Sequence, residues 1–384
     1  MKINIPFPAL LPAAVLLASS AFAKDEAALP TDTPAPKIQI ALLLDTSNSM
    51  DGLIEQAKSQ LWKVVNTFNG AKRDGRVPFV EVALYEYGNN GLHVGNHWIR
   101  QVEPLTRDLD EISRELFAFR TNGGDEYCGA VIQRALSDLS WDSSPETYKV
   151  IFIAGNEPFA QGPVDPRQAC RESMTKGIVV NTIHCGNRDE GIAGAWHDGP
   201  ALAAGEFLSI NQDKAVAHID APQDKEIAAL GIELNKTYLG YGKGWQVACA
   251  NQQAADAGAV ANEKQGAATQ RALTKSSANY FNGHWDLVDA CRAGTVKVGE
   301  VSTAELPEPM KKMTAAEREA HVAKMTAERA AIQAKIHELS RQRDAHVAEV
   351  AKKRAATDGE QTLDEAITAA VKEQAIARGY TFEK

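Results

Sequence analysis

Hydrophobic residues follow two alternating patterns in the first half of the chain. Residues 38–44 are apolar except for Gln39, which is typical of a strand buried on both faces. Residues 52–68 then carry apolar side chains at spacings of three and four, which predicts an amphipathic helix. Further strands are expected at 77–87, 97–102, 148–154, 178–184 and 206–210, with helices at 109–119, 127–139, 166–175 and 194–204. This alternation predicts a doubly wound, mostly parallel sheet with helices on both faces.

After about Asp213 the pattern becomes helical and no further strand is expected. Helices are predicted at 227–239, 245–280, 284–293, 313–353 and 363–377. In the long charged helix 313–353, one heptad seam is Val322, Ile336 and Val350, and the other is Met325, Ile332 and Leu339. These spacings favour a coiled coil, but Arg329, Arg343 and His346 interrupt the seam. The alternative is a single amphipathic helix folded back on its own domain.

The N-terminal residues resemble a targeting segment rather than part of a fold. Lys2 is followed by an apolar stretch at 9–18 and by Ala21-Phe22-Ala23, which predicts a signal peptide cleaved after Ala23. The expected organisation is a signal peptide at 1–23, a linker at 24–36, an α/β domain at 37–212, a helical region at 213–306, and a long charged helix with a C-terminal helix at 307–384. No later apolar run is long enough to span a membrane. We therefore expect an exported protein, periplasmic or secreted.

Charge and cysteine content narrow the functional classes. The formal net charge of −9 over 384 residues argues against an electrostatically driven nucleic-acid binder. The five cysteines match no zinc-site spacing. In an oxidising compartment they predict one or two disulfide bonds with one thiol left over.

The most informative motif follows the first strand directly. Asp45, Ser47 and Ser49 alternate along a short loop, Asp45-Thr46-Ser47-Asn48-Ser49, before a helix begins. Carboxylate and hydroxyl oxygens at alternate loop positions can converge on a hard divalent cation such as Mg²⁺. Two further loops are expected at the same sheet edge, 121–126 and 155–157, because ligands of parallel sheets bind beyond the carboxyl ends of the strands.

These three loops together resemble the von Willebrand factor type A domain, which is also the inserted domain of integrins. The resemblance covers residues 37–212 and implies a sheet of about six strands with a metal-ion-dependent adhesion site. In that family the loop serines coordinate Mg²⁺ directly, and the aspartate usually acts through water. A second loop adds a threonine, and the end of the central strand adds another aspartate. An acidic side chain of the binding partner then completes the coordination of the metal.

The resemblance carries over to this chain with two departures. The usual threonine aligns with Asp125, with Thr121 as a slipped substitute, and the usual strand-end aspartate falls at Ala154, which cannot bind metal. Glu157 or, more weakly, Asn156 could act in its place. The expected metal ligands are Asp45, Ser47, Ser49 and Asp125, supplemented by Thr121 and Glu157. The expected cation is Mg²⁺, with Ca²⁺ or Mn²⁺ as alternatives.

The leading functional prediction is an exported, non-catalytic module that captures an acidic group of a protein partner through this cation. One alternative is a Mg²⁺-dependent phosphoryl-transfer or hydrolytic enzyme with Asp45 as nucleophile, although the second carboxylate needed two residues later is replaced by Ser47. Another is a structural protein that assembles through its C-terminal helices, with a vestigial metal site. Locally, Ser47, Ser49 or Asp51 could simply cap a helix, and acids at 125–126 could occupy a first helical turn.

Overall fold

The computed structural model describes residues 35–210, 219–262, 266–358 and 363–382. The predicted signal peptide at 1–23 and all but the last two residues of the predicted linker lie outside these ranges, so neither prediction is tested. Among the described residues, no helix combines the length and the apolar character needed to cross a membrane.

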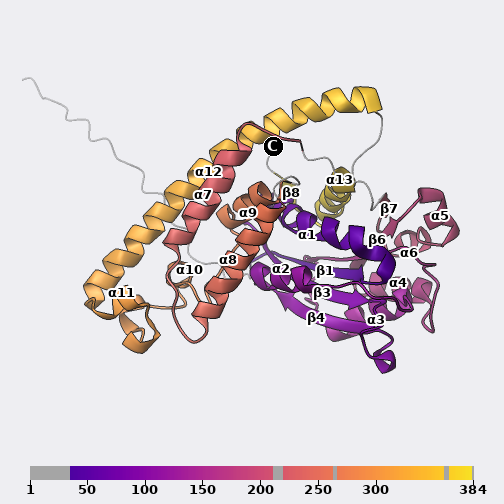
Figure 1. Cartoon of the computed structure of the whole chain (residues 1–384), viewed down its shortest axis with the longest axis horizontal. Helices are drawn as coiled ribbons and strands as arrows, with labels where there is room; N and C mark the ends of the chain where they lie inside the picture. The colour runs from indigo at the N-terminus through magenta and orange to yellow at the C-terminus, as the bar shows by residue number, and fades with distance from the viewer. Residues whose placement is uncertain (1–34, 211–218, 263–265, 359–362, 383–384) are drawn as a thin grey trace, which may run out of the picture. The chain divides into compact units, whose positions relative to one another are not determined.

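A six-stranded sheet is formed by the first half of the chain (Figure 1). Its strands are β1 (Lys37–Asp45), β3 (Phe79–Tyr87), β4 (Ile99–Thr106), β5 (Tyr148–Gly155), β6 (Ile178–Cys185) and β7 (Phe207–Ile210). They lie in the order β4-β3-β1-β5-β6-β7, and every pair is parallel except β3 with β4. The predicted fold class is confirmed. The strand order reverses beside β1, which is where open α/β sheets bind their ligands.

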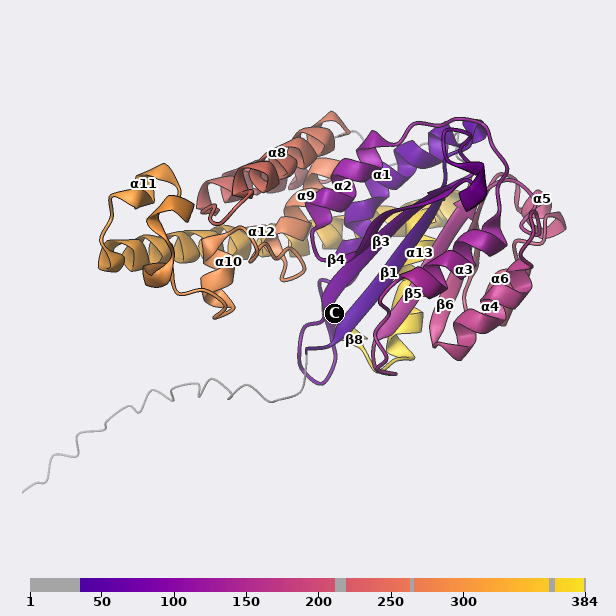
Figure 2. The same ribbon diagram turned by 90° about the horizontal axis from the view of Figure 1, so that it is seen from below.

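Both faces of the sheet are covered by helices. Ile38 and Ile40 of β1 are buried in one apolar layer, whereas Ala41 and Leu43 are buried in the other. The first layer is covered by α1 (Asp51–Asn66), α2 (Leu109–Ala118) and α13 (Leu363–Ile376), and the second by α3 (Cys128–Asp138) and α4 (Pro166–Thr175) (Figure 2). Burial on both faces explains why residues 40–44 of β1 are all apolar rather than alternating with polar residues.

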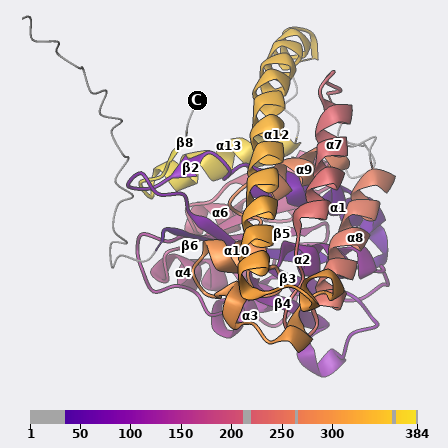
Figure 3. The ribbon, with the colours of Figure 1, turned by 90° about the vertical axis from the view of Figure 1, so that its left-hand side faces the viewer.

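A helical region follows the sheet in the chain. Its α-helices are α7 (Asp224–Glu233), α8 (Trp245–Ala261), α9 (Ala267–Ser276), α10 (Leu287–Arg292), α11 (Glu308–Lys311) and α12 (Ala315–Asp358). Helix α12 packs along α7, α9 and α10 of its own chain (Figure 3). Val322, Met325 and Ile336 are buried on the packed face. The structure therefore shows the folded-back helix, one of the two predicted alternatives, in place of a coiled coil between chains.

The arginines that interrupt the apolar seam of α12 are buried in ion pairs. Arg329 Nη1 lies 2.7 Å from Asp286 Oδ2 and 3.1 Å from Asp289 Oδ1. Arg343 Nε lies 2.6 Å from Asp224 Oδ1. A guanidinium group can take a core position when carboxylates satisfy its donors. The buried face of α12 is thus continuous, although arginines rather than apolar residues occupy two of its positions.

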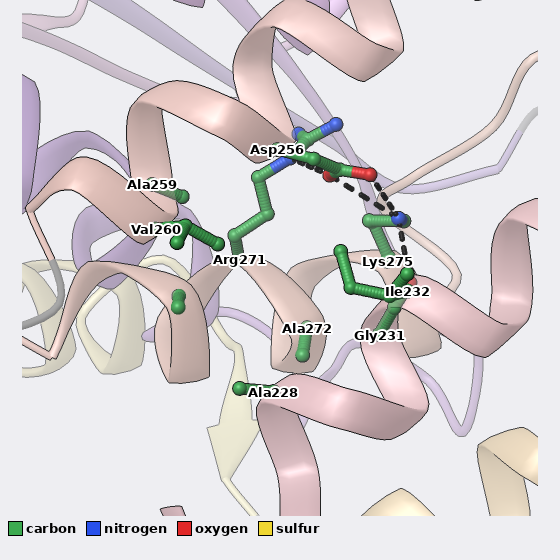
Figure 4. Close-up of a pocket in the computed structure, with 10 residues that line it drawn as sticks. Ala228, Gly231, Ile232, Asp256, Ala259, Val260, Arg271, Ala272 and Lys275 are labelled. Atoms are coloured by element: carbon green, nitrogen blue, oxygen red, sulfur yellow. Dashed lines mark hydrogen bonds and ion pairs between the residues drawn. The ribbon is translucent and has the colours of Figure 1, made fainter. Parts of the chain in front are cut away.

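A second buried ionic cluster joins the helical region to the α/β domain. Arg271 of α9 lies 2.7 Å from Asp110 of α2 and 2.6 Å from Asp256 of α8. Lys275 Nζ lies 3.0 Å from the other oxygen of Asp256 (Figure 4). Burial alone would raise the pKa of Asp256, but the charges of Arg271 and Lys275 hold it below its ordinary value. Asp256 is therefore a structural residue whose negative charge is neutralised by Arg271 and Lys275.

The last helix belongs to the α/β domain and not to the helical region. Val371 and Ala375 of α13 are buried in the same apolar layer as α1. Tyr148 of β5 donates a hydrogen bond to Gln374 of α13 at 2.7 Å. Strand β8 (Thr381–Phe382) then pairs antiparallel with β2 (Ala71–Lys72). The helical region is thus inserted in the chain between β7 and α13.

The cysteines are all free, which corrects the prediction of one or two disulfide bonds. Cys128 and Cys170 are buried in the apolar layer beneath α3 and α4, whereas Cys185 is buried on the opposite face of the sheet. Cys249 and Cys291 are partly buried in the helical region. Buried thiols act here as small apolar side chains within separate layers.

Candidate metal centre

The loop after β1 brings its predicted residues together. Asp45 is fully buried, and its Oδ1 accepts a hydrogen bond of 2.7 Å from the backbone N–H of Ser47. Ser47 is 4% exposed, and its Oγ lies 3.3 Å from the Oγ of Ser49, which is exposed. The N–H of Thr46 bonds to the carbonyl of Tyr87, which fixes the loop against β3. Asp45, Ser47 and Ser49 therefore converge, as predicted.

Helix capping does not explain these hydroxyls. Ser47 is the N-cap residue of a short 3₁₀ turn (Asn48–Met50), but its side chain makes no capping hydrogen bond. Helix α1 begins after Met50, which has no side chain able to cap. The acids at 125–126 do not occupy a first helical turn either. Helix α3 begins at Cys128 with Tyr127 as its N-cap, and its first turn contains no acid.

Glu126, and not Asp125, lies against the Asp45 loop. The Glu126 side chain is 3% exposed and hydrogen-bonds with Asp45 and Ser47. Asp125 is exposed, and the Tyr127 hydroxyl lies 3.5 Å from its Oδ2. Glu126, rather than the predicted ligand Asp125, is therefore the acid that lies beside Asp45. Thr121 is also directed elsewhere, since its hydroxyl donates to Asp51 at the start of α1.

Two glycines explain which of the adjacent acids turns inward. A Cβ atom at Gly88 would lie 2.8 Å from Asp45 Oδ1 and 2.8 Å from Glu126 Cγ, and φ of Gly88 is +76°. A Cβ atom at Gly124 would lie 2.6 Å from the carbonyl oxygen of Gly88. The backbone of the second loop thus touches the end of β3, an approach open only to glycine. This contact places Glu126 beside Asp45.

The loop after β5 contributes an amide. Ala154 is buried in the apolar layer, whereas the Asn156 Nδ2 donates to Ser49 Oγ at 3.0 Å. Glu157 is exposed, and its backbone N–H lies 3.4 Å from Glu126 Oε2. Asn156, the weaker of the two predicted substitutes, is therefore the residue that contacts the serine loop. Glu157 contacts the site through its backbone.

The electrostatics of the cluster are unbalanced. Burial raises the pKa of Asp45 well above its ordinary value, and the hydrogen bond and charge of Glu126 raise it further. Burial likewise raises the pKa of Glu126. Across the described residues, no Lys or Arg forms an ion pair with either acid. The Oδ2 of Asp45 and the Oδ1 of Asn156 are buried and accept no hydrogen bond.

This donor set fits a hard divalent cation. Two carboxylates and two hydroxyls match the oxygen ligands that Mg²⁺, Ca²⁺ and Mn²⁺ prefer. A cation beside Asp45 and Glu126 would supply the positive charge that the protein lacks there. Glu126 was not among the metal ligands that the sequence predicted. Glu126 is buried, whereas the adjacent Asp125 is exposed. The sequence shows only two neighbouring acids and does not reveal which of them is buried.

Comparison with known families agrees with this geometry. Residues 39–192 match the family model of the von Willebrand factor type A domain. The chain contains a von Willebrand factor type A domain. The match covers β1 to β6, and the structure adds β7 and α13 to the domain. No curated protein matches the chain.

Solved structures with a similar arrangement include three from different sources. Proximal thread matrix protein 1 from the mussel byssus has a TM-score of 0.36 and 15% identity, covering 47% of this chain and 43% of that one. BatB from Bacteroides thetaiotaomicron has a TM-score of 0.34 and 14% identity over 45% of this chain and 90% of that one. The vWF domain of the pili tip protein Mfa5 from Porphyromonas gingivalis has a TM-score of 0.34 and 11% identity over 47% and 92%. At these values the likeness says nothing about the function of this chain.

Proposed function

We propose that this von Willebrand factor type A domain is a metal-dependent protein-binding module of an exported protein, which captures an acidic group of its partner through a divalent cation. The residues that would hold the cation are Asp45, Ser47, Ser49 and Glu126, with Asn156 hydrogen-bonded to Ser49. The observation that carries the proposal is the pair of buried carboxylates without a cation of the protein, beside two converging hydroxyls. Asp125, Thr121 and Glu157 stay outside the proposed ligand set.

The surroundings of the cluster support capture from solution. Ser49 is exposed whereas Asp45 is fully buried, so the ligand set opens toward solvent on the serine side. A cation held there would offer its open coordination to an acid oxygen of a partner. Asp45 and Glu126 together balance a divalent charge, so the remaining attraction for an acid is weaker than at a site with one direct carboxylate.

The structure gives less support to an enzyme that uses Asp45 as its nucleophile. Asp45 is fully buried, and its Oδ1 already accepts the N–H of Ser47. A nucleophile must reach its substrate at a reactive geometry. Assembly through the C-terminal helices is likewise less supported, because the buried face of α12 packs against its own chain.

Cation binding is tested by calorimetric titration of the purified protein with Mg²⁺, Mn²⁺ and Ca²⁺. Replacing both Ser47 and Ser49 with alanine should weaken binding by at least about tenfold, because two neutral ligands are lost. The matched control is Ser137→Ala, an exposed serine on α3 that is remote from the loop. If the double variant binds cations as tightly as the unmodified protein, this ligand set is wrong.

Partner capture is tested separately. A pull-down from cell-envelope extract with Mg²⁺ should retain a partner that EDTA releases. The Ser47→Ala, Ser49→Ala double variant should not retain it, whereas Ser137→Ala should. Retention that is insensitive to EDTA would contradict capture through the metal while leaving cation binding to the calorimetric result.

A further inference from the structure

A cleft opens beside the candidate metal centre, at the carboxyl ends of β5 and β6. Its volume is about 510 Å³. Three polar side chains line it, Asn156, His184 and Glu190, together with small residues of the segments 158–160 and 193–195. Small lining residues leave room for an extended side chain of a partner.

Asn156 is shared by the metal centre and the cleft. Its amide nitrogen donates to Ser49 Oγ at 3.0 Å, on the side of the metal centre. Its Oδ1 is buried and accepts no hydrogen bond. Leaving a buried acceptor unpaired is costly. A hydrogen-bond donor supplied by a ligand would remove that cost. Because Asn156 contacts Ser49 and also lines the cleft, the metal centre and the cleft are parts of one surface.

His184 adds a second buried polar atom without a hydrogen-bond partner. The side chain is 4% exposed, and its Nδ1 makes no hydrogen bond. Its ring lies edge-on to Trp196, with centroids 5.8 Å apart, and the backbone of Gly191 packs against it, so its position is fixed. Burial lowers the pKa of His184, which keeps the imidazole neutral near pH 7 and therefore able to accept one hydrogen bond.

Glu190 supplies a negative charge at the rim. It is exposed on α5 (Arg188–Ala193) and forms no ion pair within the described part of the chain. No Lys or Arg lines the cleft. Arg188 of the same helix is stacked over the ring of Phe207 at 4.8 Å. The cleft thus presents hydrogen-bond acceptors and a carboxylate, and its occupant must bring the donors.

The charge at this sheet edge leads to the same conclusion. Asp45, Glu126, Glu157 and Glu190 together carry more negative charge, when ionised, than one divalent cation neutralises. A ligand with only an acidic group would meet residual repulsion from the rim. A ligand that also carries a positive charge would be attracted to the cleft.

We propose that the partner's recognition segment is dipolar, with an Asp or Glu side chain on the cation and a Lys or Arg side chain in the cleft between Asn156, His184 and Glu190. The second contact rests on the proposed function, because the acid on the cation sets the position of the segment. The basic side chain donates to the buried acceptors and pairs with Glu190. Specificity then comes from the spacing of the two charged residues in the partner.

The test uses a set of short fluorescent peptides. Each peptide carries one Asp at its centre and one Lys, which is moved from four residues before the Asp to four residues after it. Each has a partner peptide with norleucine in place of the Lys, which keeps the aliphatic stem and removes the charge. Binding to the full chain is measured by fluorescence polarisation with Mg²⁺ and with EDTA.

At one or more spacings, the Lys peptide should bind about fivefold tighter than its norleucine partner, the size of an exposed ion pair. Glu190→Gln should abolish this preference and leave the norleucine affinity unchanged. The matched control, Asp189→Asn, neutralises the neighbouring exposed acid that does not line the cleft and should keep the preference.

The two proposals fail in different ways. Equal binding of Lys and norleucine peptides at every spacing, with Mg²⁺-dependent binding retained, overturns the dipolar ligand and leaves acid capture intact. A Lys preference that survives Glu190→Gln also overturns the assignment of the cleft. Peptide binding that is the same with Mg²⁺ and with EDTA, or absent in both, overturns acid capture and with it the dipolar ligand.

Discussion

The protein buries acidic side chains in two regions, and the negative charge is neutralised differently in each. Where the helical region meets the α/β domain, Asp256 lies 2.6 Å from Arg271 and 3.0 Å from Lys275, and its pKa is lowered. At the candidate metal centre, Asp45 and Glu126 contact each other, and both pKa values are raised. The same chemical group is therefore held charged in one region and driven toward its neutral form in the other.

This difference separates structural acids from candidate functional ones. A buried carboxylate that has its own guanidinium or ammonium partner stabilises one packing arrangement, and removing either partner is costly. A buried pair of carboxylates without a cation needs positive charge from outside, either a proton or a metal ion. Burial of charge alone does not identify a site; the missing counter-charge does.

The largest expected effect lies in the helical region. Arg271→Met should lower the free energy of unfolding by about 3–5 kcal/mol, because Asp110 loses its ion pair and Asp256 one of two. Urea denaturation followed by circular dichroism measures the change. Arg171→Met is the control, since this exposed arginine lies 4.0 Å from Asp165 and should change stability by less than about 1 kcal/mol. A similar small loss for Arg271→Met would remove the distinction between the regions.

Neutralising an acid at the metal centre should act in the opposite direction. In EDTA, Glu126→Gln should leave thermal stability unchanged or raised, because one member of a buried like-charged pair is removed. At a Mg²⁺ concentration 100 times the dissociation constant, the unmodified protein should gain about 2.7 kcal/mol, and the variant should lose most of that gain. Glu157→Gln, at an exposed neighbour, is the control. A large loss of stability of Glu126→Gln in EDTA would mean that Glu126 is structural.

The two regions should also differ in their pH dependence. The folded-state pKa values of Asp45 and Glu126 are raised, so their contribution to stability without metal is present below the ordinary carboxyl values of 3.8 and 4.5 and is lost as pH rises through the folded values. The folded-state pKa of Asp256 is lowered, so its contribution is present above 3.8 and is lost as pH falls through the folded value.

Cation binding should therefore tighten with pH. A cation would displace the retained proton, so the association constant should rise as the pH rises from the ordinary carboxyl values through the raised folded values, by at most about tenfold per pH unit for one proton. Calorimetry in two buffers of different ionisation enthalpy counts the protons released. Glu126→Gln should flatten this dependence. A pH-independent affinity in the unmodified protein would show that the pair is already ionised without metal.

The smallest expected effect separates two adjacent acids. Asp125→Asn should change cation affinity by less than about twofold, because an exposed carboxylate outside the ligand set acts only through a screened charge. Glu126→Gln should cost at least about tenfold in the same titration. An Asp125→Asn variant that binds as poorly as Glu126→Gln would restore the ligand that the sequence comparison indicated.

The sequence predicted the parts of the site that are local in the chain. The apolar strand, the alternation of Asp45, Ser47 and Ser49, and the following helix lie within one short segment, so their convergence follows from backbone periodicity. The choice of Glu126 over Asp125 depends on the approach of Gly124 to the Gly88 carbonyl, a contact between distant segments. No local pattern encodes that contact.

The long helix α12 shows the same limit of sequence-based prediction, here for buried arginines rather than for a buried acid. Arg329 and Arg343 interrupt the apolar seam of α12 in the sequence, which weakened the predicted coiled coil. In the fold they occupy the buried face because Asp286, Asp289 and Asp224 meet them there. Hydrophobic periodicity cannot reveal a buried arginine, since the compensating acids lie on other helices.

The return of α13 to the sheet has a consequence for how the chain is made. The ribosome completes the helical region before it reaches Val371 and Ala375, which fill the apolar layer beside α1. The α/β domain therefore lacks part of its core until the segment that follows the helical region has been made. A truncation at residue 306 would remove these side chains, so a shortened product would expose the uncovered sheet face. Helix α13 thus governs the folding of a domain that begins near residue 37.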